Sequence, residues 1–303
     1  MTETTGRFTE ESMSAALHQI AEHLGVAADD AQLLRLTNNA VFALPDAGLV
    51  IRITRSYELH GRVHKVVRLA TWFAEVDAPT IRLAPSIVQP IRIGSLLATA
   101  WQYIPPTPSP PTVAELGDVL RGFHDLGTPP FALPVWDPVA DALNRLSDAE
   151  GLRDTDRDHL LTWCHRLVPR IAALNERAQA GLVHGDAHVG NLLRELTGRV
   201  VLCDFDPTCV GPWQVDLVAV AVGEARFGRV GAHAALANAY GYDVTTDPDW
   251  LLLREAREMK MVVAAVPLLA SAPGVAEEFN VRLQSVLRHD DRARWTPFAE
   301  LRR

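Results

Sequence analysis

Asp186, Asn191 and Asp204 are the residues whose types and spacing suggest chemistry. They lie in LVHGDAHVGNLLRELTGRVVLCDFD (182–206), with Asn191 five residues after Asp186 and Asp204 thirteen residues after Asn191. Carboxylate and amide oxygens suit a hard cation such as Mg²⁺, which also keeps positions for water and substrate phosphates. If Asn191 and Asp204 hold this metal, the carboxylate of Asp186 is left to accept the proton of an attacking hydroxyl. Phosphoryl transfer depends mainly on positioning and charge neutralisation, so the three residues form a sufficient set.

The segment between Asn191 and Asp204 predicts a β-hairpin. Two short apolar runs flank a turn at Thr197–Gly198, and a hairpin brings its two ends together. We therefore expect Asn191 and Asp204 to be close, with Asp186 on the loop that enters the hairpin. The alternative is that Asp186 and Asn191 only cap turns while Asp204 ends a strand. The spacing of all three residues favours the site.

The first third of the chain predicts a helix followed by a small antiparallel sheet that carries a second helix. Residues 9–26 have helical periodicity, with Thr9 as the N-cap and Gly25 as the end. The order of the next elements is β-β-α-β-β. They are two strands around the turn PDAG (35–54), a helix that ends before Pro79 (61–79), and two β-like runs (81–93 and 95–104).

A proline-rich stretch, PPTPSPP (105–111), predicts a stiff connector, because proline restricts φ and removes a donor. We place a boundary there, between a first lobe of residues 1–104 and a second of residues 105–303. The second lobe is predicted to be mainly helical. Its helical patterns cover 112–127, 137–148, 154–178 and a region from about Asp249.

The composition indicates a globular protein with an acidic balance. The 303 residues are enough for one large domain or two lobes, each with its own core. The net charge of −8 argues against nucleic-acid binding. Most of the excess acid lies beyond Ile104, which favours a cationic or polar partner, although acidic surfaces also serve solubility alone.

The cysteines and the apolar runs predict a cytoplasmic protein without a membrane span. The three cysteines form no CxxC pair, which suits a reducing compartment where each is a small buried hydrophobe. The N-terminus lacks the pattern of a signal peptide, and the longest apolar run, from Met261, is too short to cross a bilayer. The basic residues are nearly all arginine. Lys65 and Lys260 are the only lysines, so a mechanism that needs a lysine has two candidates.

HGDAHVGN (184–191) followed by LCDFD (202–206) resembles the aminoglycoside phosphotransferase family, whose catalytic loop reads HGDxxxxN. Other pieces fall in the family's order and cover most of the chain: RLTNNAVFAL, LVIRIT, ATWFAEVDAP, WQYIPP, LRGFHDLG and GPWQVDLV. The resemblance implies an α+β, bilobal protein-kinase-like fold. Its small N-lobe has an antiparallel sheet with a helix, and its larger C-lobe is mainly helical.

The resemblance also implies roles for individual residues. Asp186 is the catalytic base, and Asn191 and Asp204 bind Mg²⁺ that arrives with ATP or GTP. His184 braces the loop, and the carboxylate of Asp216 tethers the loop backbone. The hinge that meets the adenine edge corresponds to the end of the last sheet strand: Gln102, Tyr103 and Ile104.

The nucleotide-binding pattern departs from that of kinases in two places. The strand lysine that pairs with nucleotide phosphates is replaced by Arg52, which can also contact phosphate. The glutamate of the following helix aligns with Val66, which cannot form an ion pair. Glu58 is a candidate substitute upstream. Either Arg52 binds phosphate without the usual partner, or nucleotide binding is weak.

The glycine-rich loop is also missing, and Asn38 with Asn39 is the expected replacement, because asparagine tolerates left-handed conformations. Asp206 lies two residues after Asp204, so on an extended chain both side chains point to one side. Asp206 is thus either a second metal or substrate contact or a cap of the following turn. Two further residues are candidates for substrate contact: His188 and Trp213.

The sequence predicts an ATP- or GTP-dependent enzyme that moves a γ-phosphate to a hydroxyl of a small molecule. The acceptor classes are an aminoglycoside, an amino sugar or a related metabolite, and a cationic acceptor would suit the acidic second lobe. The alternative is a pseudokinase or a nucleotide-binding regulatory module without phosphotransfer, which the missing lysine and glutamate favour. A protein kinase comes third, because few residues separate DFD from VDL and leave little platform for a peptide.

Overall fold

The structure is a computed structural model that describes the chain in five stretches: 9–36, 39–54, 60–147, 149–270 and 272–301. The chain forms two compact units. We call them the sheet unit, residues 1–111 with 190–207, and the helical unit, residues 112–189 with 208–303. Asn38 and Glu58, both named above, lie outside the described residues.

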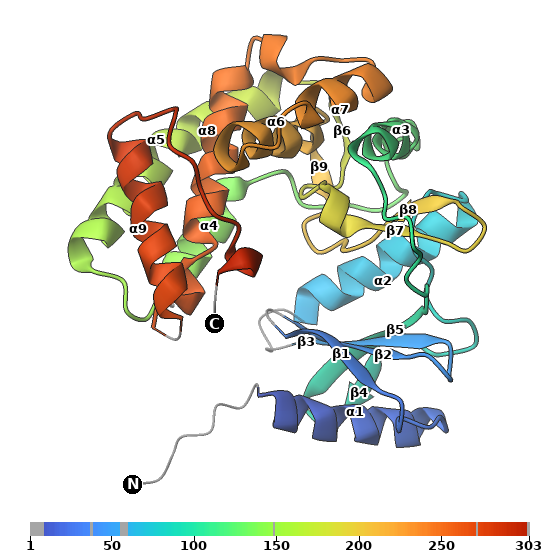
Figure 1. Cartoon of the computed structure of the whole chain (residues 1–303). Coiled ribbons are helices and arrows are strands. Elements are labelled where there is room, and N and C mark those ends of the chain that lie inside the picture. Colours follow the sequence, from blue (N-terminus) through green and yellow to red (C-terminus); the bar gives the residue numbers. More distant parts are fainter. Residues whose placement is uncertain (1–8, 37–38, 55–59, 148, 271, 302–303) are drawn as a thin grey trace, which may run out of the picture. The chain divides into compact units, whose positions relative to one another are not determined.

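The sheet unit is built on a five-stranded antiparallel sheet with the order β1-β2-β3-β5-β4 (Figure 1). The predicted hairpin around PDAG is confirmed, because β2 and β3 pair up to Leu44 and Leu49. A strand that the sequence pattern did not predict, β1, extends the sheet beside β2. The strands are β1 (Gln32–Leu36), β2 (Asn39–Leu44), β3 (Leu49–Thr54), β4 (Ile91–Ile93) and β5 (Leu96–Gln102).

Two helices lie on opposite sides of this sheet (Figure 1). The predicted first helix is confirmed as α1 (Glu10–Leu24), with the Thr9 hydroxyl accepting from the Ser12 N–H and with Gly25 ending it. The second is α2 (His60–Glu75), which ends before Pro79 as predicted.

The alternation of side chains along β3 decides where Arg52 points. Ile51 and Ile53 belong to the apolar core under α1, and neighbouring residues of a strand face opposite sides of the sheet. Arg52 therefore projects from the other face. α2 packs against β5 on that face, so the sequence of β3 places one cation beside α2.

The β-like run at 81–93 is only partly a strand. β4 covers its last three residues, while Leu83 makes an isolated bridge to Trp101. Pro85 and Pro90 interrupt the run, and proline offers no N–H to a sheet ladder.

The predicted hairpin of the opening motif is confirmed as β7 (Leu192–Arg194) and β8 (Val200–Leu202). Its two ends meet, because the Cys203 N–H donates to the carbonyl of Asn191 at 2.9 Å. The backbone of Leu202 exchanges hydrogen bonds of 2.8 and 2.9 Å with the segment after α2. The hairpin is thereby fixed to the sheet unit.

In its described residues the helical unit consists of helices and one small antiparallel pair of strands, β6 and β9. The three helices predicted between 112 and 178 and the late helices are confirmed. The elements are α3 (Val113–His124), α4 (Pro138–Ser147), α5 (Asp154–Arg177), β6 (Ala180–Val183), β9 (Cys209–Pro212), α6 (Val215–Phe227), α7 (Ala232–Tyr240), α8 (Trp250–Val263) and α9 (Pro273–Leu287).

Helix α6 was not predicted, and its burial explains why. Every residue from Asp216 to Gly223 is buried, so the helix has no polar face and no amphipathic period. Glycine is needed where α3 meets α7. These helices pack so closely that a Cβ on Gly117 would lie 2.8 Å from the Cβ of Ala239.

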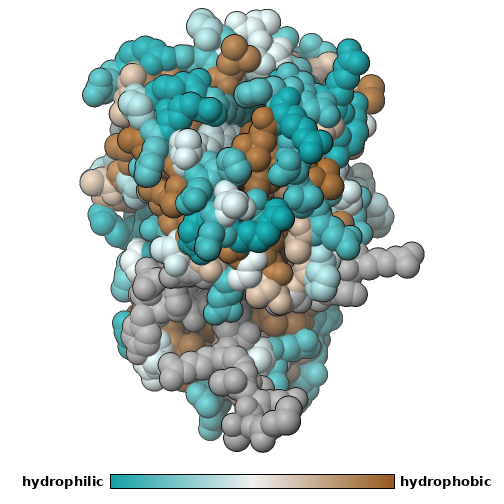
Figure 2. Space-filling view, turned by 90° about the vertical axis from the view of Figure 1, so that its left-hand side faces the viewer, coloured by the Kyte–Doolittle hydropathy of each residue, from teal (hydrophilic) through white to brown (hydrophobic). Residues whose placement is uncertain are grey.

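Cys164 and Cys209 are buried as predicted, whereas Cys203 is half-buried. Figure 2 shows a face on which hydrophilic residues predominate and hydrophobic ones form small separate groups. In the described chain the three cysteines form no disulfide, and burial raises the pKa of Cys164 to about 11 and that of Cys203 to about 12. Each helix of the described residues is too short or too polar to cross a bilayer.

Candidate active site

Side chains hold the loop that carries Asp186 by accepting hydrogen bonds from its backbone N–H groups. Strand β6 ends at Val183, and Gly185 has a φ of 81°, a conformation that glycine adopts without a steric penalty. The buried carboxylate of Asp216 accepts the N–H of His184 at 2.6 Å and that of Gly185 at 2.7 Å. The ring of His184 accepts the N–H of Asp186 at 3.3 Å. The predicted tether by Asp216 and brace by His184 are confirmed.

Asp216 is in turn supported by residues that the sequence pattern did not single out. Nε2 of His124 lies 3.0 Å from the carboxylate of Asp216, and Nδ1 lies 2.8 Å from the hydroxyl of Tyr240. Burial raises the pKa of Asp216, but the hydrogen bonds from His124 and His184 outweigh it and lower that pKa. Burial and the charge of Asp216 raise the pKa of Tyr240 to about 12. The loop thus rests on an ionised, fully buried carboxylate.

The side chain of Asp186 meets two cations from helix α8. Its Oδ1 accepts from Nη1 of Arg257 at 2.6 Å and from Nζ of Lys260 at 3.0 Å. Lys260 also donates to the carbonyl of Gly185 at 3.0 Å. Arg257 and Lys260 are three residues apart, which places them on one face of the helix. Neither was predicted to belong to the site.

These cations determine the ionisation of Asp186. Burial alone raises the pKa of its carboxyl, but the charges of Lys260 and Arg257 hold that pKa well below the usual range. Nε2 of His188 lies 4.0 Å from the carboxylate. Burial, opposed by the charge of Asp186, lowers the pKa of His188 to about 4. At neutral pH Asp186 is ionised and His188 is uncharged.

The hairpin ends present Asn191 and Asp204 within the sheet unit. Asn191 is buried, and Asp204 has a φ of 68°, a left-handed conformation that aspartate tolerates better than most residues. The next side chain, Phe205, is buried against Phe73 of α2 and Trp101 of β5, with ring centroids 5.1 and 6.0 Å apart. This aromatic anchor fixes the backbone on both sides of Phe205.

Asp206 contacts three residues near the predicted nucleotide site: Arg52, Asn39 and Lys65. Its carboxylate forms an ion pair with Arg52 and accepts from the side-chain amide of Asn39 at 3.5 Å. Its carbonyl accepts from Nζ of Lys65 of α2 at 2.5 Å. Lys65 was not predicted here, although it precedes Val66, the position aligned with the family's glutamate. Val66 is buried, so Lys65 brings a cation where kinases have an anion.

The prediction that Asp204 and Asp206 point to one side of an extended chain is wrong, because the chain is not extended at Asp204. The left-handed φ of Asp204 breaks the extended conformation. Each carboxylate instead has its own arginine. Nη1 of Arg35 on β1 lies 3.6 Å from Oδ2 of Asp204, while Arg52 pairs with Asp206.

The hinge residues differ in what their N–H groups do. The N–H of Gln102 donates to the carbonyl of Arg82 at 3.0 Å, and the N–H of Tyr103 donates to the carbonyl of Gly48 at 2.9 Å. Among the described residues, the N–H of Ile104 has no such partner. Of the three predicted hinge residues, Ile104 thus has the donor that is left for a ligand.

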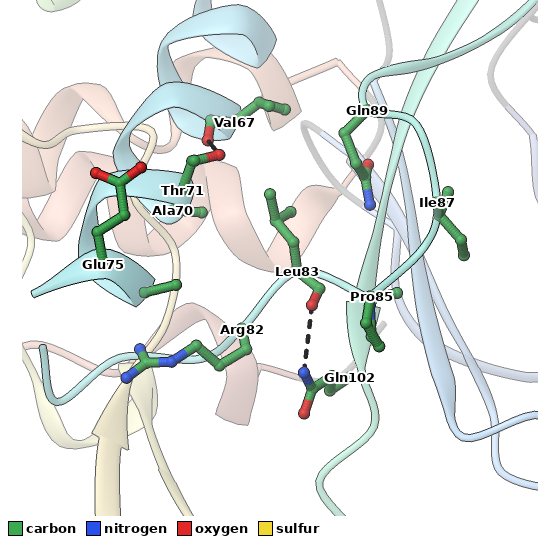
Figure 3. A pocket seen from close by; sticks show the side chains of 12 residues that line it. Val67, Ala70, Thr71, Glu75, Arg82, Leu83, Pro85, Ile87, Gln89 and Gln102 are labelled. Carbon is green, nitrogen blue, oxygen red and sulfur yellow. Dashed lines mark hydrogen bonds between the residues drawn. The ribbon is translucent and has the colours of Figure 1, made fainter. Parts of the chain in front are cut away.

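A cavity of the described residues lies elsewhere in the sheet unit. It measures about 810 Å³ and is lined by α2 and by the segment from Arg82 to Gln89. The side chain of Gln102 lies at its edge and donates to the carbonyl of Leu83 at 3.3 Å (Figure 3). None of the other predicted nucleotide-binding residues lines this cavity.

Trp213 belongs to an aromatic cluster of the helical unit. It stacks on Tyr240 with ring centroids 5.5 Å apart and meets the edge of Tyr242 at 4.8 Å. Through Tyr240 this cluster reaches His124 and hence Asp216.

The donor set at the hairpin fits Mg²⁺. Asn191 and Asp204 offer an amide and a carboxylate oxygen, which are the hard donors that this ion takes. Within the described stretches, no group of three or more histidine, cysteine, aspartate or glutamate side chains could hold a metal by itself. The residues therefore suit an ion that shares its coordination with nucleotide phosphates and water.

The fold is that of the kinase-like phosphotransferases. The chain is similar to the structure of a microcompartment-associated aminopropanol kinase, with a TM-score of 0.67 and 18% identity over 93% of this chain and 100% of that chain. It is also similar to aminoglycoside phosphotransferase APH(3'')-Id from Streptomyces rimosus, with a TM-score of 0.61 and 16% identity over 82% and 98% of the two chains. The chain is likewise similar to a GDP and kanamycin complex of an APH(2'') enzyme, with a TM-score of 0.61 and 14% identity over 92% of this chain and 99% of that chain.

The family follows from the sequence itself. The model described as the phosphotransferase enzyme family, APH, matches residues 30–255. The chain belongs to this family and is a phosphotransferase, which confirms the resemblance carried by HGDAHVGN and LCDFD. A search of the curated proteins found no match.

Proposed function

We propose that this phosphotransferase uses ATP or GTP with Mg²⁺ to phosphorylate a hydroxyl of a small molecule, with Asp186 as the base. The observation that carries the proposal is the loop of Asp186, whose backbone is tethered to Asp216 and which leads within five residues to Asn191. Residues 1–104 would serve nucleotide binding and residues 105–303 acceptor binding. The nucleotide supply and the reduced thiols suit the cytoplasm.

In the proposed reaction Asp186 orients the acceptor hydroxyl and takes its proton. The O–H bond of the acceptor breaks, its oxygen forms a bond to the γ-phosphorus, and the bond from that phosphorus to the β-phosphate oxygen breaks, releasing the nucleoside diphosphate. The charges of Lys260 and Arg257 keep Asp186 ionised before the acceptor binds. Because they also make it a weak base, much of its effect would come from orientation.

The sheet unit supplies the groups for the nucleotide. Arg52 and Lys65 would neutralise phosphate oxygens, with Asp206 holding both cations in place. The N–H of Ile104 would donate to the base edge. Bound Mg²⁺ would add charge neutralisation between the phosphates, and Asn191 and Asp204 are the residues that would hold it.

A regulatory module that binds nucleotide without transfer remains the competing hypothesis. Buried Val66 favours it, because the usual lysine–glutamate pair is missing. The pairing of Arg52 with Asp206 speaks against it, since it supplies a different anchor for the strand cation.

The test combines thermal stability with turnover. ATP and Mg²⁺ together should stabilise the protein more than either alone, and nucleotide should be consumed with at least one acceptor of a panel of aminoglycosides, amino sugars and hydroxylated metabolites. Asp186→Ala should abolish consumption while retaining the thermal shift. Stabilisation without consumption for any acceptor would support the binding module, and full turnover by Asp186→Ala would exclude the proposed base.

A further inference from the structure

The two cations that contact Asp186 carry more charge than its carboxylate. In the described part of the chain, Asp186 is the only carboxylate within ion-pair distance of Arg257 and Lys260, so two cations share one anion. His188 is uncharged at neutral pH and does not change this balance. The side chains are about 17% (Arg257), 30% (Lys260) and 28% (Asp186) exposed, so the excess charge lies in a partly enclosed place that solvent still reaches.

The other charged residues of α8 face elsewhere. Glu255 pairs with Arg166 and Arg170 of α5. Glu258 pairs with Arg254 of the same helix and with Arg226. Arg254 also pairs with Asp291. The positive face of Arg257 and Lys260 is thus not balanced by the two acidic residues of α8.

Arg257 also has a hydrogen-bond donor without an acceptor among the described residues. Its Nε–H is buried and has no hydrogen-bond partner among the described residues. A buried donor without an acceptor is unfavourable, and a guanidinium binds a carboxylate or a phosphate through two parallel hydrogen bonds. Both the unused donor and the excess charge would be satisfied by an anionic group of a ligand.

We infer that Arg257 and Lys260 form an anion subsite, so that the acceptor carries a carboxylate or a phosphate near its reacting hydroxyl. This inference rests on the proposed function and narrows its acceptor class. The comparison structures include an aminopropanol kinase and aminoglycoside phosphotransferases, whose names denote amino compounds. The acidic second lobe also favoured a cationic acceptor, but the charges next to Asp186 favour the opposite sign.

An anionic acceptor would also act on the base. Its anion would share the N–H groups that now bind Oδ1 of Asp186, which lessens the hold of the two cations on that carboxylate. Asp186 would become a better proton acceptor only with the correct acceptor bound. The γ-phosphate is another source of an anion at this place, so the experiment has to separate the two sources.

The two lysines of the chain permit a direct test. Lysine acylation at low reagent concentration, read residue by residue by mass spectrometry, reports Lys65 and Lys260 separately. Inorganic phosphate, gluconate and glucose 6-phosphate are the anionic probes, and sorbitol and glucosamine are the neutral and cationic controls. We expect at least one anion to slow acylation of Lys260 about tenfold at about ten times its Kd, with no effect of sorbitol or glucosamine.

Variants locate the effect. Arg257→Gln should abolish protection of Lys260, whereas Arg254→Gln, which removes a cation from the same helix outside the subsite, should retain it. Protection of Lys260 by sorbitol or glucosamine, by ATP with Mg²⁺ alone, or by none of the three anions would overturn the inference.

Turnover separates this inference from the proposed function. With an anionic acceptor, Lys260→Met should raise the acceptor KM about 10- to 100-fold and leave the ATP KM unchanged. An equal rise of the ATP KM would assign Lys260 to the γ-phosphate and overturn the inference alone. If ATP with Mg²⁺ fails to protect Lys65 and no acceptor is phosphorylated, the proposed function fails, while protection of Lys260 still decides the subsite.

Discussion

Asp206 in the sheet unit and Asp186 in the helical unit each meet one arginine and one lysine, but they bind them differently. Asp206 pairs with Arg52 through its carboxylate and with Lys65 through its carbonyl. Asp186 accepts both Arg257 and Lys260 on a single carboxylate oxygen. In the sheet unit the cations fix a backbone segment, whereas in the helical unit they control the ionisation of a side chain.

This difference suits the two clusters, Asp206 with Arg52 and Lys65 and Asp186 with Arg257 and Lys260, to different roles. A segment held by its backbone and by buried Phe205 keeps its place whichever ligand is bound, which suits a nucleotide site used in every cycle. A carboxylate held by cations responds to whatever competes for them, which suits selection of the acceptor. Substitutions in the two groups of residues should therefore change the kinetics of different substrates.

The largest expected effect is that of Asp186→Asn. Asparagine keeps the shape but cannot take a proton, so kcat should fall about 10²- to 10⁴-fold with the ATP KM nearly unchanged. Steady-state kinetics in both substrates gives the answer. Because the pKa of Asp186 lies well below its usual range, the wild-type rate should show no loss from protonation of this group above pH 4.

Asp216→Ala should cause the largest loss of stability. It leaves the N–H groups of His184 and Gly185 and the ring of His124 without their shared acceptor. Breaking such a buried charged network costs about 3–5 kcal/mol. Denaturant unfolding measures the loss, and Asp216→Asn, which keeps one acceptor oxygen, should lose less. If both variants were as stable as the wild type, the loop would not depend on this tether.

Lys65→Met distinguishes the two clusters most directly. Loss of one charged hydrogen bond at about 1.5–3 kcal/mol corresponds to a rise of about 10- to 100-fold in the ATP KM. The acceptor KM should not change, in contrast to Lys260→Met. Lys65→Arg, which keeps the charge, is the matched control and should recover much of the affinity. A rise confined to the acceptor KM would contradict the assignment of Lys65 to the nucleotide.

The sequence predicted what depends on neighbours in the chain. The hairpin from Asn191 to Asp204 follows from two apolar runs and a turn, and the first helix follows from the cap Thr9 and the stop Gly25. Buried α6 lacks the polar face that would reveal a helix, so its pattern was ambiguous.

The cations of the site depend instead on distant packing. Arg257 lies 71 positions from its partner Asp186, and no local pattern brings the two together. Lys65 is next to Val66, the position that aligns with the family's glutamate, but the phase of α2 buries Val66 and turns Lys65 toward Asp206. Lysine usage was the available signal: both lysines in this arginine-rich chain contact a candidate site segment.

The smallest expected effect concerns His188 and pH. Its pKa is about 4 in the folded protein and about 6.5 in an unfolded chain. Between these values the unfolded state binds more protons, so His188 lowers the free energy of unfolding as pH falls from 6.5 to 4. His188→Gln should therefore match the wild type at pH 8 and unfold at a higher temperature at pH 5. His64→Gln, at an exposed position of α2, is the control. A gain of the same size at both pH values would mean that His188 acts through packing and not through its charge.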